Sequence, residues 1–213
     1  MSLERASTRY TYFFFFFFNS IGCGATPQYL NRLLANRAGD LRRVEIISIN
    51  PLDDTFTNPE LKDSFFTNSL FASYFVRSSI RNGSASYIPA FLNEMPRLFD
   101  ENILPLDAAF IQVSPPDKHG FCSLGISVEV TKAAIRNAKH VFAQINRHMP
   151  RVHGDTFVHM NDIDAYVEYD EPIIELNYTK QITDVEKTIG KKVAELIEDR
   201  SARTRTCFPF KTK

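Results

Sequence analysis

Residues 108–145 read AAFIQVSPPDKHGFCSLGISVEVTKAAIRNAKHVFAQI, and this stretch decides the fold class. An apolar run opens it and another closes it, and a segment with apolar residues at helical spacing lies between them. A strand, a helix and a second strand in that order are typical of α/β domains. The expected elements are a strand at 108–113, a loop at 114–120, an extended piece at 121–124, a helix at 130–138 and a strand at 140–145.

The same alternation continues towards both ends of the chain. Phe13–Phe18 is an unbroken phenylalanine run followed by turn residues, which favours a fully buried strand. Thr26 offers an N-cap and Pro27 a first helical position, so we expect a helix that Gly39 ends. Further strands are expected at 44–49, 165–169 and 173–176, and further helices at 69–81 and 90–99. The pattern predicts an α/β fold with an open parallel or mixed sheet and helices on both faces.

The last expected helix has the clearest boundaries. Thr183 and Glu186 form a capping box, and apolar residues follow at spacings of four and three. Those apolar residues are Val185, Ile189, Val193, Leu196 and Ile197. Beyond Asp199 the sequence carries basic residues and no acidic one, so we expect a solvated tail at 200–213.

Charge and cysteine usage argue against several classes of protein. Lys and Arg together number 25, as do Asp and Glu, so the zero net charge indicates no nucleic-acid or membrane-surface partner. Cys23, Cys122 and Cys207 are widely spaced, which is typical of free thiols in a reducing compartment, and we expect a cytoplasmic protein with Cys122 in its core. No CxxC or CxxH pair is present, which argues against a structural zinc site.

The phenylalanine run has other readings. The aromatic stretch from Tyr10 to Phe18 is far shorter than the roughly 20 residues that a membrane helix needs. Two arginines precede it, as in a signal peptide, but Asn19 and Ser20 interrupt it before any small-residue cleavage site. We therefore expect a buried strand, and a misread coding frame stays open as an account of the repeated phenylalanine.

The loop after the first strand is one candidate ligand site. Its glycines, Gly22 and Gly24, are explained as well by a tight turn that needs positive φ as by a ligand. The helix amides at Gln28 and Tyr29 offer donors for a carboxylate or a phosphate.

The loop at 114–120 is a second candidate. Two prolines stiffen it, and Asp117, Lys118 and His119 place polar groups at the carboxyl end of a strand, where open α/β sheets bind ligands. A purely structural loop is the alternative. The candidate cleft residues in the two loops are Gly22, Cys23, Gly24, Ala25, Thr26, Pro115, Pro116, Asp117, His119 and Gly120.

Histidines and acidic residues near the end of the domain offer metal-ligand types but no metal motif. The residues concerned are His148, His153, His159, Asp155 and Asp162. Their spacing matches no common site, so we expect no bound metal, and we expect the acidic stretch at 162–171 to be a solvated face.

The stretch from Ile111 to Pro172 resembles the acetyl-CoA hydrolase/transferase family, which includes 4-hydroxybutyrate CoA-transferases. The residues that carry the resemblance are IQVSPPDKHGFCSLGISVEVTKAA and then AQINRHMPRVHGDTFVHMNDIDAYVEYDEP. Weaker matches are GCGATP at 22–27, PEL at 59–61 with NS at 68–69, and SYIP at 86–89. The resemblance covers most of the chain from the first strand to Asp199.

The resemblance implies an enzyme of two similar α/β domains that moves coenzyme A between a short acyl-CoA and a carboxylate such as 4-hydroxybutyrate, acetate or butyrate. A glutamate forms a glutamyl-CoA thioester during this exchange. In the family that glutamate lies in the second domain, so we expect no catalytic residue in this chain. The two loops named above would line the substrate or coenzyme A cleft, no cofactor other than coenzyme A as a substrate is implied, and the intact form is expected to be a homo-oligomer.

Two departures from the family pattern bear on domain organisation. At 200–213 the sequence is RSARTRTCFPFKTK, where family members have a glycine-rich strand and loop. At 8–18 it is TRYTYFFFFFF, where family members have a turn with lysine and glycine before the first strand. We therefore expect an amino-terminal domain at 1–199, an unmatched tail at 200–213 and a missing second, catalytic domain, as in a frameshifted or fragmentary gene product. A non-catalytic domain that binds a partner is the alternative, and a sugar-phosphate isomerase is a weaker one because its acid/base motifs are not found.

Overall fold

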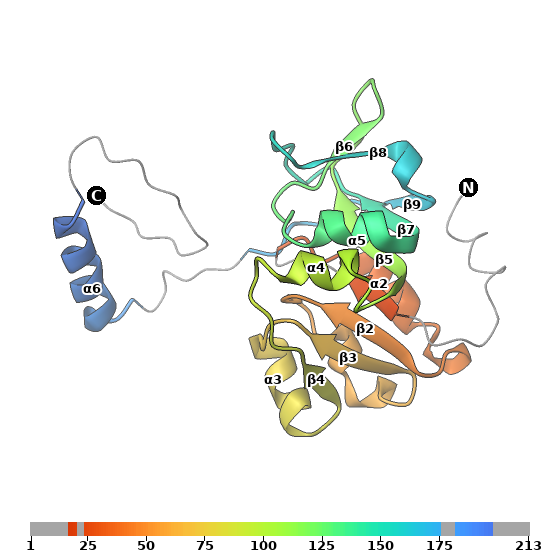
Figure 1. Ribbon diagram of the computed structural model, residues 1–213, viewed down its shortest axis with the longest axis horizontal. Coiled ribbons are helices and arrows are strands. Elements are labelled where there is room, and N and C mark those ends of the chain that lie inside the picture. The colour runs from red at the N-terminus through yellow and green to blue at the C-terminus, as the bar shows by residue number, and fades with distance from the viewer. Residues whose placement is uncertain (1–16, 21–23, 176–181, 198–213) are drawn as a thin grey trace. The chain divides into compact units, whose positions relative to one another are not determined.

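The structure is a computed structural model that describes residues 17–20, 24–175 and 182–197 (Figure 1). The chain divides into two compact units, 1–174 and 175–213, and the first contains the whole sheet. Predictions that fall on Phe13–Phe16, Gly22, Cys23, Cys207 or the tail at 200–213 lie outside the described residues. The expected domain boundary at 199 stays a prediction.

The first unit is built on a seven-stranded sheet in which every described pairing is parallel. Its order is β4-β3-β2-β1-β5-β7-β9. The strands are β1 (Phe17–Ser20), β2 (Val44–Ser48), β3 (Phe65–Ser69), β4 (Ala85–Tyr87), β5 (Leu106–Val113), β7 (Ala138–Ile145) and β9 (Ala165–Glu168). This arrangement confirms the predicted α/β class.

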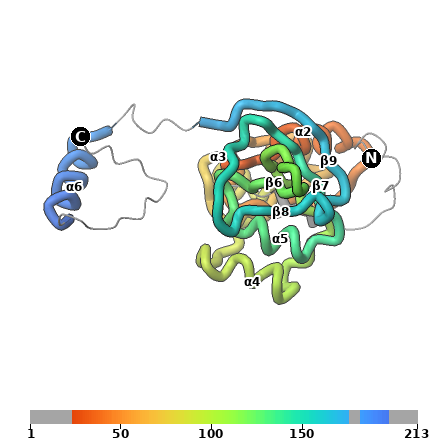
Figure 2. Tube along the Cα trace, turned by 90° about the horizontal axis from the view of Figure 1, so that it is seen from above, coloured from red at the N-terminus to blue at the C-terminus, as the bar shows by residue number. Residues whose placement is uncertain are grey.

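Helices cover both faces of the sheet, and the central strands β2 and β5 bury apolar side chains on two sides. Against one face pack α4 (Met95–Asp100) and α5 (Thr131–Asn137), whose buried residues join Ile47 and Ala109 in one core cluster. On the other face, Ile46 packs in a cluster with Leu34 of α2 (Gln28–Ala35). Figure 2 shows α2 on one side of the sheet and α4 and α5 on the other.

Smaller elements complete the first unit. Strands β6 (Phe121–Ser123) and β8 (Phe157–His159) form a separate antiparallel pair, which buries Cys122 as predicted. Helix α3 (Tyr74–Arg81) precedes β4. Among the described residues, 3₁₀ turns lie at η1 (Ala38–Asp40), η2 (Thr55–Thr57), η3 (Pro59–Leu61) and η4 (Met160–Asp162).

Three expected helix starts and one expected helix end are wrong. Helix α4 begins at Met95 and not at residue 90, and α2 ends at Ala35, before Gly39. Phe65–Ser69 is a strand with alternate residues buried, and Ser73 still has extended backbone, so α3 starts at Tyr74 and not at Ser69. At the first helix, Pro27 and not Thr26 occupies the N-cap position. The extended piece expected at 173–176 is also not a strand over 173–175.

In the second unit, α6 (Asp184–Glu195) confirms the predicted capping box. The Thr183 N–H donates to Glu186 Oε2 over 2.7 Å, and the Glu186 N–H donates to Thr183 Oγ1 over 3.2 Å. The backbone donation from Thr183 lowers the pKa of the Glu186 carboxyl.

Candidate functional site

The order of the strands places a topological switch point between β1 and β5. From β1 the chain first builds the β2-β3-β4 side of the sheet and then returns to the other side of β1 with β5. In open α/β sheets, ligands bind outside the carboxyl ends of the strands at such a point. The loops that follow β1 and β5 therefore flank the position where a ligand is expected.

The described part of the loop after β1 is packed into the domain. Ala25 and Thr26 are each 3% exposed. Thr26 is bonded on both sides, since its Oγ1 accepts from the Leu52 N–H over 3.3 Å and its carbonyl accepts from Gln112 Nε2 over 2.9 Å. A Cβ added at Gly24 would lie 3.1 Å from Cδ1 of Ile126, so glycine lets this loop approach the chain after β6.

The start of α2 does not offer free amides in the way the sequence indicates. The Tyr29 N–H donates to Oε1 of Gln144 over 3.1 Å, and the Gln28 N–H donates to the carbonyl of Thr26 over 2.9 Å. Because both donors are bonded within the domain, the expected carboxylate or phosphate site on these two amides is wrong.

Behind the loop lies a group of buried amide side chains. Gln112 on β5, Gln144 on β7 and Asn146 directly after β7 are 6%, 0% and 0% exposed. Nδ2 of Asn146 donates to Oε1 of Gln112 over 2.6 Å, and Gln112 in turn donates to Thr26. These amides hold the carboxyl ends of β5 and β7 and the loop after β1 together.

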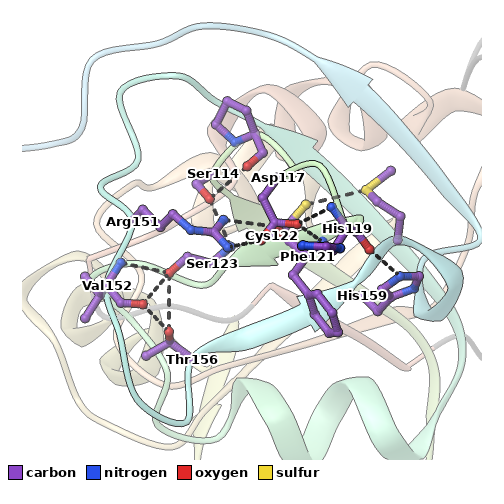
Figure 3. Close-up of polar contacts among 12 residues, drawn as sticks. Ser114, Asp117, His119, Phe121, Cys122, Ser123, Arg151, Val152, Thr156 and His159 are labelled. Carbon is purple, nitrogen blue, oxygen red and sulfur yellow. Dashed lines mark hydrogen bonds and ion pairs between the residues drawn. The ribbon is translucent and has the colours of Figure 1, made fainter.

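The loop at 114–120 is held by hydrogen bonds within the loop and by the side chains of Arg151 and His159 (Figure 3). Ser114 and Ser123 close its base, with the Ser123 N–H donating to Ser114 Oγ over 2.9 Å. Oδ1 of Asp117 accepts from the N–H groups of His119 and Phe121 over 2.9 and 3.0 Å. The donation from Phe121 is the main reason why the pKa of the Asp117 carboxyl lies below its usual range.

Arg151 and His159 brace the far end of this loop. Arg151 pairs with Oδ2 of Asp117 over 2.6 Å and donates to the carbonyl of Phe121 over 2.9 Å. Nε2 of His159 lies 3.0 Å from the carbonyl oxygen of His119 (Figure 3). The loop is therefore a fixed hairpin tip.

The structure places the expected site residues in two groups. Gly24, Ala25 and Thr26 lie at the switch point against Gln112 and Ile126. The other group forms the braced tip next to the β6-β8 pair, which extends beyond the main sheet in Figure 1, and comprises Pro115, Pro116, Asp117, His119 and Gly120. Sequence reasoning missed Gln112, Asn146 and Arg151, although a glutamine or asparagine in or beside an apolar strand was a usable signal.

Cys122 and Asp53 are two titratable residues whose pKa values are raised in the fold. Burial raises the pKa of the Cys122 thiol to about 11, so this thiol is a packing residue and not a nucleophile. Burial also raises the pKa of Asp53, whose carboxylate accepts from Asn31 Nδ2 over 3.2 Å. A hollow of about 1020 Å³ lies between η2 and α3, and none of its lining residues belongs to the loops at 24–26 or 114–120.

Within the described ranges, three or more histidine, cysteine, aspartate or glutamate side chains nowhere gather as a metal site would require. The helices described are also too short or too polar to cross a membrane.

Comparison with known proteins identifies similar sequences. A profile of the acetyl-CoA hydrolase/transferase N-terminal domain matches residues 16–176. The 4-hydroxybutyrate coenzyme A transferase of Clostridium kluyveri is 46% identical over 144 residues, which are 68% of this chain and 33% of that protein. The succinyl-CoA:acetate/propanoyl-CoA:succinate CoA transferase of Fasciola hepatica is 38% identical over 181 residues, which are 84% of this chain and 37% of that protein. The chain thus spans about a third of the length of these relatives.

Solved structures share the fold. RipA from Yersinia pestis superimposes with a TM-score of 0.83 at 29% identity, over 93% of this chain and 48% of that one. The 4-hydroxybutyrate CoA-transferase from Porphyromonas gingivalis superimposes with a TM-score of 0.71 at 26% identity, over 93% of this chain and 46% of that one.

Proposed function

Because the chain belongs to the acetyl-CoA hydrolase/transferase family, we propose that it is the amino-terminal part of a CoA-transferase that exchanges coenzyme A between a short acyl-CoA and a carboxylate. The proposed acyl groups are 4-hydroxybutyryl, acetyl and butyryl, because relatives at 46% and 33% identity are named for such substrates. The identity of 46% over 144 residues is the observation that carries this proposal.

The proposed exchange uses a glutamate that we place in the second domain of the family. Its carboxylate attacks the thioester carbonyl, the carbon–sulfur bond breaks, and coenzyme A leaves as the thiolate, which gives a mixed anhydride. The thiolate then attacks the glutamyl carbonyl and releases the first carboxylate, which leaves a glutamyl-CoA thioester. An acceptor carboxylate takes the acyl position by the same two steps in reverse, and the glutamate is regenerated.

The part proposed for this chain is to form one wall of the substrate cleft. Gly24–Thr26 lies at the switch point, where the backbone of a tight loop can approach a ligand closely. The tip at 115–120 is fixed by Arg151 and His159, so it offers a rigid second surface. Neither loop is proposed to break or form a bond.

The test is complementation. This chain is mixed with the part of the Clostridium kluyveri enzyme that follows its matching region, and labelled acetate is supplied with butyryl-CoA. We expect label to enter acetyl-CoA only when both polypeptides are present. Exchange by this chain alone would contradict the proposal, and so would the absence of exchange when the Clostridium kluyveri enzyme, split at the same point, is active.

A second candidate function is a non-catalytic domain that binds another α/β domain. Large apolar side chains stay exposed near the carboxyl ends of β3 and β4, and they favour this reading. They are Phe71, Tyr74, Tyr87, Phe91 and Leu92. Binding of the Clostridium kluyveri part without any exchange of label would favour this candidate over the first.

A further inference from the structure

Hydrogen bonds connect four neighbouring segments along the carboxyl edge of the sheet. They run from Thr26 after β1, to Gln112 on β5, to Asn146 after β7, and to Glu171 after β9. Thr26, Gln112 and Asn146 are all at least nine-tenths buried. Buried amides are costly unless every polar atom is bonded, so their arrangement is restricted.

Asn146 uses its whole hydrogen-bonding capacity. Its Nδ2 donates to Gln112 Oε1 and to the carbonyl of Glu171, both over 2.6 Å. Its Oδ1 accepts from the N–H groups of His148 and Glu171 over 2.9 and 3.3 Å. An asparagine side chain has two donor hydrogens and two acceptor lone pairs, and all four are occupied here.

The direction of the connection is fixed by backbone groups. Two backbone N–H groups face Oδ1 of Asn146, and because an N–H cannot accept, the oxygen must point to them and Nδ2 must point to Gln112. Gln112 must then present Oε1 to Asn146 and Nε2 to the carbonyl of Thr26. The orientation of one amide therefore determines the hydrogen bond that Thr26 receives.

At its other end the connection holds the segment that follows β9. The Tyr169 N–H donates to the carbonyl of Ile145 over 3.0 Å, and its ring stacks on Tyr29 at 3.9 Å between centroids. Glu171 pairs with Arg32 over 3.0 Å. Segment 169–171 is thus attached to β7 and to α2, the helix that follows the loop containing Thr26.

We propose that Asn146 and Gln112 are positioning residues that set where Gly24–Thr26 lies at the switch point and that couple this loop to segment 169–171. The functional half of this inference rests on the proposed function, because it takes Gly24–Thr26 to be a wall of the substrate cleft. The structural half does not, because it concerns only how the loop is held.

The first test reads the loop at a residue that neither amide touches. The Leu52 N–H donates to Oγ1 of Thr26, so its hydrogen exchange reports whether Thr26 keeps its place. Asn146→Asp replaces both donors by an acceptor, which forces the Gln112 amide to turn and lose Thr26. In this variant the Thr26 carbonyl loses its donor on Gln112, and the Glu171 carbonyl loses its donor on residue 146. Because each segment loses about one hydrogen bond, we expect roughly tenfold faster exchange at Leu52 and at Glu171 at pH 7.

A second variant separates the two ends of the connection. Gln112→Glu keeps an acceptor for Asn146 but loses the donor to Thr26, so we expect faster exchange at Leu52 and unchanged exchange at Glu171. Asn137→Asp is the matched control, because Nδ2 of Asn137 also makes two donor bonds, to Asp100 and Ala133, at the opposite edge of the sheet. It is expected to lower overall stability without a selective change at Leu52.

The exchange pattern decides the structural half of the proposal. Unchanged protection of Leu52 in Gln112→Glu, or a change no larger than in Asn137→Asp, overturns it. If Asn146→Asp does not fold, Gln112→Glu alone gives this answer.

The complementation assay then tests the link to function. Gln112→Glu should raise KM for the acyl-CoA about tenfold and leave kcat within about twofold, since it moves a binding wall and no reacting group. A selective change at Leu52 without a change in KM would confine the role of the two amides to structure. Failure of the unaltered chain to complement would contradict the proposed function and leave the exchange result standing.

Discussion

Gly120 and His159 approach each other so closely that a Cβ on Gly120 would lie 2.9 Å from Nε2 of His159. Gly120 also has a φ of +84°, a conformation that other residues adopt at a cost. Gly120→Ala is therefore expected to destabilise the domain by about 1–3 kcal/mol. Urea unfolding measures this change. Gly39→Ala is the matched control, because nothing lies within 4 Å of its added Cβ. If Gly39→Ala lost as much stability as Gly120→Ala, the account would be contradicted.

The hairpin tip should depend on the charge of Asp117. Its pKa is lowered in the fold, so the ionised form stabilises the folded state above the unfolded pKa, and this contribution is lost as pH falls through the folded value. Asp117→Asn is expected to destabilise the chain at pH 7 and to have a smaller effect at pH 3. Urea unfolding at the two pH values tests this, and an equal loss at both would show that the charge is not responsible.

Asp53 should behave in the opposite way. Burial raises its pKa, so the fold favours the protonated form, and stability decreases as pH rises from the unfolded pKa through the folded one. Asp53→Asn removes this decrease. The gain in the free energy of unfolding that the substitution gives is therefore expected to be larger at pH 7 than at pH 4. Asp63→Asn, at an exposed position, serves as the control. A less stable Asp53→Asn variant at pH 7 would mean that the carboxylate is needed in the fold.

The isolated chain is expected to self-associate through the exposed side chains near β3 and β4. Phe91 is 75% exposed and Leu92 is 59% exposed, and soluble monomers rarely carry a large apolar patch. The double variant Phe91→Ser, Leu92→Ser should lower the mean particle mass in light scattering. A monodisperse monomer of the unaltered chain would contradict this prediction.

The sequence predicted the fold well where each element has a strong pattern of its own. The strand at 108–113 and the helix at 130–138 agree closely with β5 and α5 because apolar spacing and flanking loops coincide there. Phe65–Ser69 was missed, because a five-residue strand with three polar positions owes its place to pairing with β2, which is a long-range effect.

The site was predicted less completely for a related reason. The glycine and proline loops are visible in the sequence, but the bonds that fix them come from residues far along the chain. Asn146 and Gln112 are 34 positions apart, and Arg151 stands 34 positions from Asp117. Gln112 and Gln144 were read only as parts of apolar strands, and Asn146 was not singled out, although buried amides in or beside neighbouring strands indicate a shared hydrogen-bond network.

The most direct measurement locates the covalent intermediate. This chain and the Clostridium kluyveri part are mixed with butyryl-CoA, the reaction is treated with borohydride, which reduces a glutamyl-CoA thioester, and both polypeptides are mapped by mass spectrometry. The account predicts a reduced glutamate on the Clostridium kluyveri part and no modified acidic residue on this chain. A reduced aspartate or glutamate within this chain, formed with or without the other part, would contradict it.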